Sequence, residues 1–307
     1  MKGIPSLFGA RSGACVENSF HTIYWKTFDL VKADTDELRQ LAFKLRYDVF
    51  CNHDFGSELF ERTDCFTLRS GTTDDTEKDS YDHNADHYLL MHRKSGNVAG
   101  TVRVVHFDAD TPIFSFPLQE VCDHPFLHEG SKEQRVCEIS RLCMAPQFRK
   151  RDSDGRTLPA YTHIKPPQNR GASDVAMIRR RIPFAPLGLM MAAFESALSR
   201  RTMNCVLAMD PSDFKILRSL GVVYKVLGPR LSNYGNMQPV VFNVKAVLDH
   251  MAQHNRPCWE VISRQGALHE QANELALEQW SDSIFGEDTR SAIFDYAQDR
   301  EREYREK

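Results

Sequence analysis

Two stretches rich in β-branched and apolar residues, 88–91 and 98–107, flank the turn-forming residues 94–97, Lys-Ser-Gly-Asn. Extended apolar segments joined by a short glycine-containing turn are typical of a β-hairpin. The chain is therefore expected to contain an antiparallel sheet, and the remaining elements must be compatible with it.

The segments around this hairpin alternate between strand and helix patterns. Asp34, with Glu37 three residues later, resembles an N-cap signature for a helix whose apolar stripe includes Leu38 and Leu45. Further strands are predicted at residues 24–31, 135–144, 204–209, 222–227 and 239–244, and helices at 187–201 and 211–220, the latter closed by Gly221. This order predicts a three-layer α/β/α domain on a mixed, mostly antiparallel sheet.

The domain boundaries follow from where this pattern weakens. Residues 1–22 lack periodicity and are expected to form an irregular leader, and residues 23–245 form the α/β domain. Within it, residues 146–186 contain several prolines and little hydrophobic pattern, which indicates a basic flap or insertion. Residues 246–307 are predicted to form a helical C-terminal extension.

Composition excludes several classes of protein. Of the 307 residues, 41% are hydrophobic and 26% charged, as in ordinary globular chains, and the net charge of −3 identifies no partner. No apolar run approaches the roughly 20 residues that span a bilayer, and no signal-like segment opens the chain, so a cytoplasmic location is expected. The eight cysteines form no CxxC pair, which argues against a disulfide framework or a zinc site.

Residues 137–142, Cys-Glu-Ile-Ser-Arg-Leu, carry polar side chains within a strand pattern. Alternation would place Glu138, Ser140 and Leu142 on one face, and Ile139 and Arg141 on the other. Buried Glu, Ser and Arg side chains are costly unless they find partners or line a wet cleft. Both a functional site and a structural ion-pair network are compatible with this pattern.

This segment resembles a known family. Residues 138–141, Glu-Ile-Ser-Arg, resemble the Glu-x-Ser-Arg signature of acyl-homoserine-lactone synthases and the related N-acyl amino acid synthases, which share the acetyltransferase-like (GNAT) fold. Three more features match in the same order: Arg-Tyr-Asp-Val-Phe at residues 46–50, the acidic pair Asp79 and Asp82, and the strand segments 88–90 and 100–103. The pattern is most similar to the N-acyl amino acid synthase and PEP-CTERM/exosortase-associated acyltransferase branch.

The chain also departs from the lactone synthases. Phe55 stands about where they carry a tryptophan, residues 146–186 exceed their compact loop, and about sixty residues follow the last matched strand. These departures disfavour a homoserine lactone product but leave acyl transfer as the expected reaction.

The resemblance implies transfer of a fatty acyl group from a thioester to an amine. An amine with a pKa of about 8 is mostly protonated at neutral pH, so a base must remove a proton. Glu138 is the candidate base, acting directly or through water. A backbone N–H at a strand bulge would hold the thioester carbonyl and its developing negative charge.

Other residues are expected to bind substrate or organise the site. The resemblance places Arg46 and Phe50, one helical turn apart, in the substrate pocket, although Phe50 is equally compatible with the core. The site-organising candidates are Asp79, Asp82, Arg103, Ser140 and Arg141. Their alternative interpretation is a salt-bridge network that only supports the fold.

The donor is expected to be an acyl carrier protein. Residues 183–188 lack the dense glycines with which ordinary acetyltransferases bind the coenzyme A pyrophosphate, although acyl-CoA remains an alternative donor. Carrier proteins are acidic, and a basic docking surface is predicted from Arg149, Lys150, Arg151, Arg179, Arg180 and Arg181. The absence of interleaved aromatic residues and of a recognition helix argues against nucleic acid.

Other enzyme classes lack their motifs. The sequence has no Gly-x-Ser-x-Gly elbow, HExxH motif or P-loop, and no metal or redox cofactor is expected. The predicted function is transfer of a long acyl chain to the amino group of an amino acid or similar small amine. The alternatives are an acyl-homoserine-lactone synthase and a non-catalytic module that binds acyl groups or carrier protein. A lipid product would also allow peripheral membrane contact.

Overall fold

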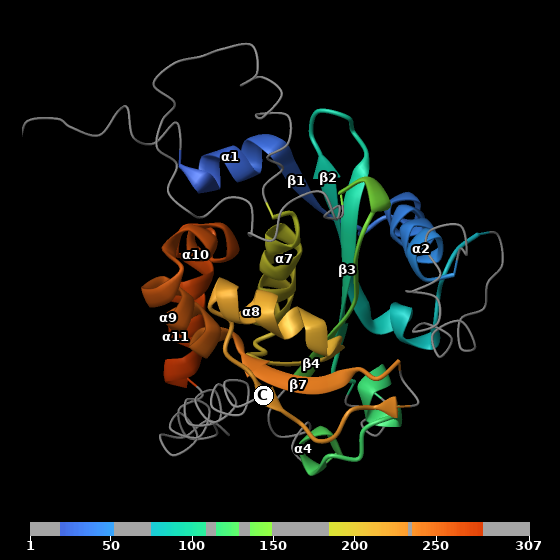
Figure 1. Ribbon diagram of the computed structural model, residues 1–307, viewed down its shortest axis with the longest axis vertical. Coiled ribbons are helices and arrows are strands. Elements are labelled where there is room, and N and C mark those ends of the chain that lie inside the picture. The colour runs from blue at the N-terminus through green and yellow to red at the C-terminus, as the bar shows by residue number, and fades with distance from the viewer. Residues whose placement is uncertain are drawn as a thin grey trace, which may run out of the picture.

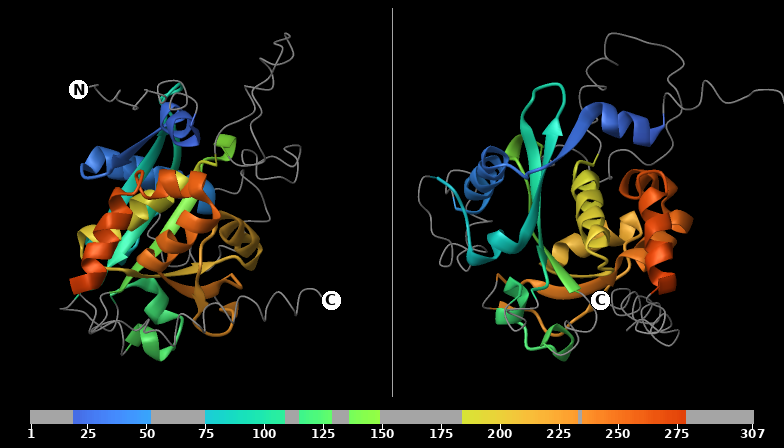
Figure 2. Two further views of the ribbon diagram at one scale, coloured as in Figure 1. Left: turned by 90° about the vertical axis from the view of Figure 1, so that its left-hand side faces the viewer. Right: turned by 180° about the vertical axis from the view of Figure 1, so that it is seen from behind.

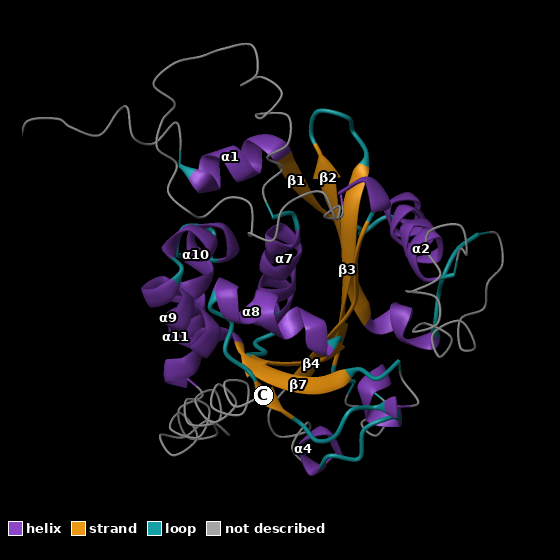
Figure 3. Cartoon of the chain, viewed as in Figure 1, coloured by secondary structure: helices purple, strands orange, loops and turns teal. Residues whose placement is uncertain are grey.

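The computed structural model describes residues 19–51, 75–108, 115–128, 136–148, 184–232 and 235–278. Its centre is a seven-stranded sheet in the order β1-β2-β3-β4-β5-β7-β6 (Figure 1, Figure 3). β4 and β5 pair in parallel, whereas every other neighbouring pair in this sheet is antiparallel. The mixed, mostly antiparallel α/β fold predicted from the sequence is therefore confirmed.

The elements have the following bounds. The strands are β1 (Phe28–Lys32), β2 (Ala85–His92), β3 (Val98–His106), β4 (Val136–Met144), β5 (Asn204–Met209), β6 (Lys225–Val226) and β7 (Gln238–Asn243). The helices are α1 (Phe20–Thr27), α2 (Asp36–Phe50), α4 (Pro125–His128), α7 (Pro186–Ser199), α8 (Phe214–Leu220), α9 (Val244–His254), α10 (Arg256–Ile262) and α11 (Ala267–Glu278). Short 3-10 helices are η2 (Ser80–Asn84), η3 (Pro117–Glu120), η4 (Pro146–Phe148) and η5 (Pro211–Asp213).

Helices cover both faces of the sheet. α2 lies against one face, and α7 lies against the other with α9, α10 and α11 outside it (Figure 1, Figure 2). Alternation along β3 divides the two faces, since Val102 and Val104 pack in the main core beside α7. Val105 belongs to a second apolar cluster with η3, on the face that also carries Arg103. The candidate site residues Arg103 and Glu138 therefore lie on the face away from α7.

Most elements predicted from the sequence are present, with corrections at their ends. The 88–107 hairpin is β2–β3, and the strands expected at 135–144 and 204–209 are β4 and β5. The strand expected at 24–31 is wrong over its first half, because residues up to Thr27 form α1, whose N-cap is Ser19. The cap of α2 is Thr35, which accepts the N–H of Leu38, rather than Asp34.

Both ends of the predicted domain need adjustment. Residues 20–22, expected in the irregular leader, belong to α1. The expected boundary after residue 245 falls inside α9, and the helices beyond it share the main core with α7 through Trp259 and Ile262. The strand expected at 222–227 is reduced to Lys225–Val226, and the expected flap beyond Phe148 lies outside the described residues up to 183.

No helix among the residues described is long and apolar enough to cross a membrane.

Tyr24 joins α1 to the start of α7. Its buried hydroxyl donates to the carbonyl of Ala185 at 2.6 Å and accepts the N–H of Gly188 at 2.7 Å. A Cβ added at Gly188 would lie 2.7 Å from that hydroxyl, so this approach requires glycine. We expect Tyr24→Phe to lower the free energy of unfolding by about 1–3 kcal/mol, because it leaves buried backbone groups without this partner. Urea unfolding checks this value, and an unchanged midpoint would contradict it.

Candidate active site

Glu138 lies at the centre of the sheet. It pairs with Val105 of β3 on one side and with Val206 of β5 on the other. Its side chain is buried, and its Oε2 accepts the backbone N–H of Leu118 at 2.7 Å. Because Val105, Leu118 and Val206 belong to one apolar cluster, the carboxyl group is surrounded mainly by hydrophobic side chains.

This environment changes the acidity of the carboxyl group. Burial raises the pKa of Glu138 from 4.5 to about 7, against the opposing effects of the Leu118 N–H and of the positive charges on Arg103 and Arg141. A carboxyl group with this pKa is divided between its two protonation states near neutral pH. It can therefore accept and return a proton under those conditions.

The parallel ladder between β4 and β5 ends at Glu138. Its register partners are Val136 with Asn204, Cys137 with Cys205, and Glu138 with Val206. β4 then continues to Met144 and β5 to Met209 without further pairing to each other. Glu138 thus lies at the point where the two strands part.

β4 contains a bulge just beyond this point. Arg103 pairs with Ser140 but Thr101 pairs with Cys143, so Arg141 and Leu142 together oppose one residue of β3. Arg141 has a φ of 53°, in the left-handed region. The simple alternation predicted for residues 137–142 is wrong here, since the bulge turns Arg141 to the same face as Arg103. Leu142 is instead 39% exposed.

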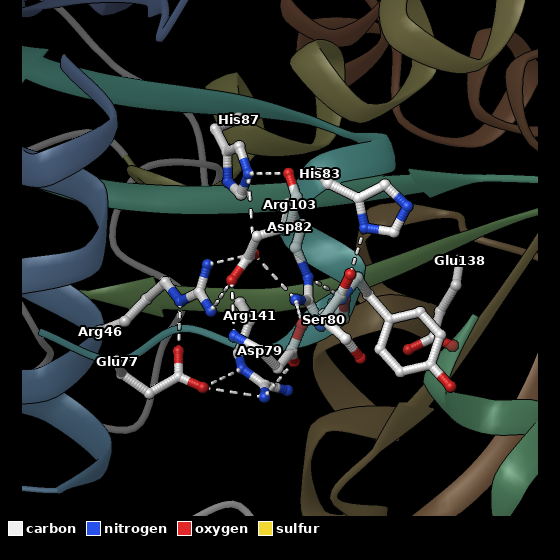
Figure 4. A network of polar contacts seen from close by, with 12 residues as sticks. Arg46, Glu77, Asp79, Ser80, Asp82, His83, His87, Arg103, Glu138 and Arg141 are labelled. Atoms are coloured by element: carbon white, nitrogen blue, oxygen red, sulfur yellow. Dashed lines mark hydrogen bonds and ion pairs between the residues drawn. The ribbon is translucent and has the colours of Figure 1, made fainter. Parts of the chain in front are cut away.

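Three arginines and three carboxylates form an ion-pair network beside this bulge (Figure 4). Arg46 pairs with Glu77 and forms a two-pronged contact with Asp82 at 2.8 and 3.1 Å. Arg103 contacts Asp79, Asp82 at 2.9 Å and the hydroxyl of Ser140 at 3.0 Å. Arg141 contacts Glu77 and Asp79, each at 2.9 Å.

The network balances its own charge. Despite the opposing cost of burial, Arg141 and Arg46 lower the pKa of Glu77, and Arg46 and Arg103 lower that of Asp82. Both carboxylates are therefore ionised at neutral pH, each bonded to two guanidinium groups. In Figure 4, no interaction drawn joins Glu138 to the network. Glu77, Asp79 and Asp82 are thus held in ion pairs with arginines, whereas the buried Glu138 accepts the backbone N–H of Leu118.

The structure brings together six of the residues selected from the sequence: Arg46, Asp79, Asp82, Arg103, Ser140 and Arg141. Phe50 lies apart, packed against the small cluster of Leu45, Val49, Cys143 and Ala145. The basic residues from Arg149 to Arg181 lie outside the described residues. Met191, Phe194 and Leu198 of α7 are buried in the main core.

Sequence reasoning missed three contributors. Glu77 is fully buried and joins Arg46 to Arg141, yet it lies in an acidic stretch with no regular pattern. His87 packs edge-on against Phe43, and burial lowers its pKa to about 4, so it is neutral. Leu118 contributes its backbone N–H, and the type of a residue does not indicate such a role. Of these three residues, only Glu77 could have been selected from the sequence, because it lies close to Asp79 and Asp82.

Among the described residues, no group of three or more His, Cys, Asp or Glu side chains is arranged to hold a metal ion.

Comparison with known proteins identifies the class. Residues 45–157, which include Glu138 and every member of the ion-pair network, match the family model of the acetyltransferase (GNAT) domain. No curated protein sequence matches the chain significantly. The fold and this match confirm the acyltransferase class predicted from the sequence.

Several solved structures resemble the chain. FeeM, an N-acyl amino acid synthase from uncultured soil microbes, is 10% identical, with 73% of this chain and 93% of that chain covered and a TM-score of 0.43. The AHL synthase LasI is 15% identical, with coverage of 70% and 87% and a TM-score of 0.39. BjaI, a CoA-dependent acyl-homoserine lactone synthase, is 18% identical, with coverage of 81% and 99% and a TM-score of 0.44.

Proposed function

We propose that this protein is an N-acyltransferase that moves a long-chain acyl group from a carrier-bound thioester to the amino group of an amino acid or similar small amine. The observation that carries the proposal is the placement of Glu138. It is a buried carboxyl group with a pKa of about 7, at the point where β4 and β5 part. A base with this pKa suits proton removal from an ammonium group near neutral pH.

The chemistry follows from this placement. The amine nitrogen attacks the thioester carbonyl, a C–N bond forms, and Glu138 takes the proton that the nitrogen loses. The C–S bond then breaks, and the thiolate leaves with a proton that Glu138 can return. The backbone N–H groups that follow Glu138, where β4 and β5 part, are the candidates to hold the developing negative charge of the carbonyl oxygen.

The start of α7 supports a carrier protein over coenzyme A. A diphosphate binds a helix N-terminus through free backbone N–H groups. Here Pro186 has no N–H, that of Leu187 is bonded to the carbonyl of Phe184, and that of Gly188 is bonded to Tyr24. A diphosphate would have to displace these bonds. The donor therefore fits better if its phosphopantetheine arm is presented by a protein.

The ion-pair network acts in this proposal as a support. It fixes η2 against β3 and β4 through Asp79, Arg103 and Arg141. Its carboxylates are each paired with guanidinium groups, which disfavour their protonation, so none is the base. The positive charges of Arg103 and Arg141 nevertheless act on Glu138 and limit how far burial raises its pKa.

The test is a reconstituted reaction. The purified full chain is incubated with an acylated carrier protein and a panel of amino acids, small amines and S-adenosylmethionine, and products are identified by mass spectrometry. An N-acyl amino acid supports the proposal, and an acyl-homoserine lactone would replace it with the alternative synthase. Binding of the acylated carrier protein without turnover, by folded protein, would overturn the enzyme assignment.

The donor preference gives a separate prediction. With one acyl chain and one amine, we expect a higher kcat/KM for the acylated carrier protein than for the matching acyl-CoA. The preference should decrease as salt is raised, because docking to an acidic carrier is electrostatic. Steady-state kinetics with both donors measures this. Equal values for the two donors at all salt concentrations would remove the carrier proposal while leaving acyl transfer intact.

A further inference from the structure

Cys137 and Cys205 face each other across the parallel strand pair β4–β5. They are register partners, and their Sγ atoms lie 3.5 Å apart. Both side chains are fully buried in the main core, and both are free thiols. Glu138 is the next residue along β4, with its side chain on the opposite face of the sheet.

The geometry of this pair suits a covalent link. Adjacent strands lie about 4.8 Å apart, which is within the range of about 4.4–6.8 Å between the Cα atoms of disulfide-bonded cysteines. The sulfur atoms must approach from 3.5 Å to the bonding distance of about 2.05 Å. Rotation about the Cα–Cβ bonds moves the sulfur atoms by this amount, so the strands need not shift as a whole.

We propose that Cys137 and Cys205 are an oxidisable pair whose disulfide staples β4 to β5 immediately before Glu138. A hydroperoxide oxidises one thiol to a sulfenic acid, and its O–O bond takes up the two electrons. The second thiol then attacks that sulfur, the S–S bond forms, and water leaves. Burial raises the pKa of the Cys205 thiol well above its usual range, so little thiolate is present and the reaction is slow. Because both thiols are buried, small neutral oxidants are favoured.

The staple has a consequence for acyl transfer, and this consequence alone rests on the function proposed above. Only three register pairs join β4 to β5, and the disulfide would link the side chains of the middle pair covalently. A donor arm that enters beyond Glu138 needs room between the strands. We expect the oxidised protein to show a several-fold lower kcat/KM for the acyl donor, restored by dithiothreitol.

The link itself is tested without any activity. The full chain is treated with hydrogen peroxide, alkylated under denaturing conditions, digested without reductant and analysed by mass spectrometry. We expect a dithiothreitol-sensitive peptide joining Cys137 to Cys205 and, in a sample measured before alkylation, an intact mass lower by two hydrogens for this bond. It should persist in Cys122→Ala, whose buried thiol contacts the carbonyl of Leu227, and disappear in Cys205→Ala.

The possible results separate the two claims. If both cysteines of the oxidised wild type remain alkylatable, or if either forms its disulfide elsewhere, the pair is not as proposed, whatever the enzyme does. If the link forms but the rate is unchanged, the staple does not control donor entry. An inactive reduced protein would contradict the proposed function and leave the disulfide result standing.

Discussion

Replacing Glu138 by glutamine is expected to lower the rate of acyl transfer by about 10²–10⁴-fold, which is the usual contribution of a positioned general base. Glutamine has nearly the same shape, and its carbonyl oxygen can still accept the N–H of Leu118 that Glu138 accepts at 2.7 Å. The change therefore removes proton acceptance while keeping the packing. Single-turnover rates with saturating acyl donor and amine measure the effect.

The pH dependence gives a second readout of the same residue. Glu138 must be ionised to accept a proton, so its contribution to kcat/KM should rise with pH and level off above about 7, where burial has placed its pKa. Deprotonation of the free amine adds its own rise at higher pH, near its pKa of about 8. The limb near 7 should be absent from the Glu138→Gln variant. A wild-type profile without that limb would argue against Glu138 as the base.

Stability separates a catalytic loss from misfolding. The folded-state pKa of Glu138 is raised from 4.5 to about 7, so the native protein binds more protons than the unfolded chain between these values. Stability therefore falls as pH rises through that window, and Glu138→Gln removes this cost. We expect the variant to be at least as stable as the wild type above the window. Glu274→Gln, a change of an exposed carboxylate in α11, is the matched control and should retain activity.

The hairpin and β4 could be predicted because their local patterns agree with the final fold. β2 and β3 combine β-branched residues with the turn around Gly96, whose φ of 71° is one that glycine adopts readily. α1 could not be predicted in this way. The residues up to Thr27 look like a strand, but the cap at Ser19 and the contact of Tyr24 with α7 select a helix. Tertiary packing there overrides local propensity.

The candidate site was predictable by residue type but not by geometry. The motif at residues 138–141 selected Glu138 and Arg141 as candidates, yet alternation placed Arg141 on the wrong face. The register of β3 against β4 creates the bulge, and register depends on partners far away in the sequence. The pKa of Glu138 likewise depends on Leu118 and on burial by η3, to which sequence spacing gives no guide.

Replacing Glu77 by alanine is expected to lower the free energy of unfolding by about 3–5 kcal/mol, because it leaves two buried guanidinium groups without their shared partner. Glu77 is fully buried, and it bonds to the Nε atoms of both Arg46 and Arg141, the latter at 3.0 Å. Domains are usually stable by about 5–15 kcal/mol, so much of the variant should unfold at moderate temperature. Urea unfolding followed by circular dichroism measures the loss.

The same network sets the response to acid. The folded-state pKa values of Glu77 and Asp82 lie below their unfolded values. Their stabilising contribution is therefore present above the unfolded pKa of about 4 and is lost as pH falls below it. We expect the wild type to lose stability steeply in that range and Glu77→Ala to lose less, since it has one of these carboxylates fewer.

An exposed pair on α2 provides the matched control for this loss. Asp36 and Arg39 lie 2.6 Å apart, with 86% and 37% of their side chains exposed, and such surface pairs contribute only about 0–1 kcal/mol. Asp36→Ala should therefore leave the unfolding midpoint almost unchanged. A Glu77→Ala variant as stable as this control would show that the network does not support the fold. If the network is a scaffold, the folded fraction of Glu77→Ala should retain the limb near pH 7 that depends on Glu138, whereas loss of that limb would assign Glu77 to the chemistry.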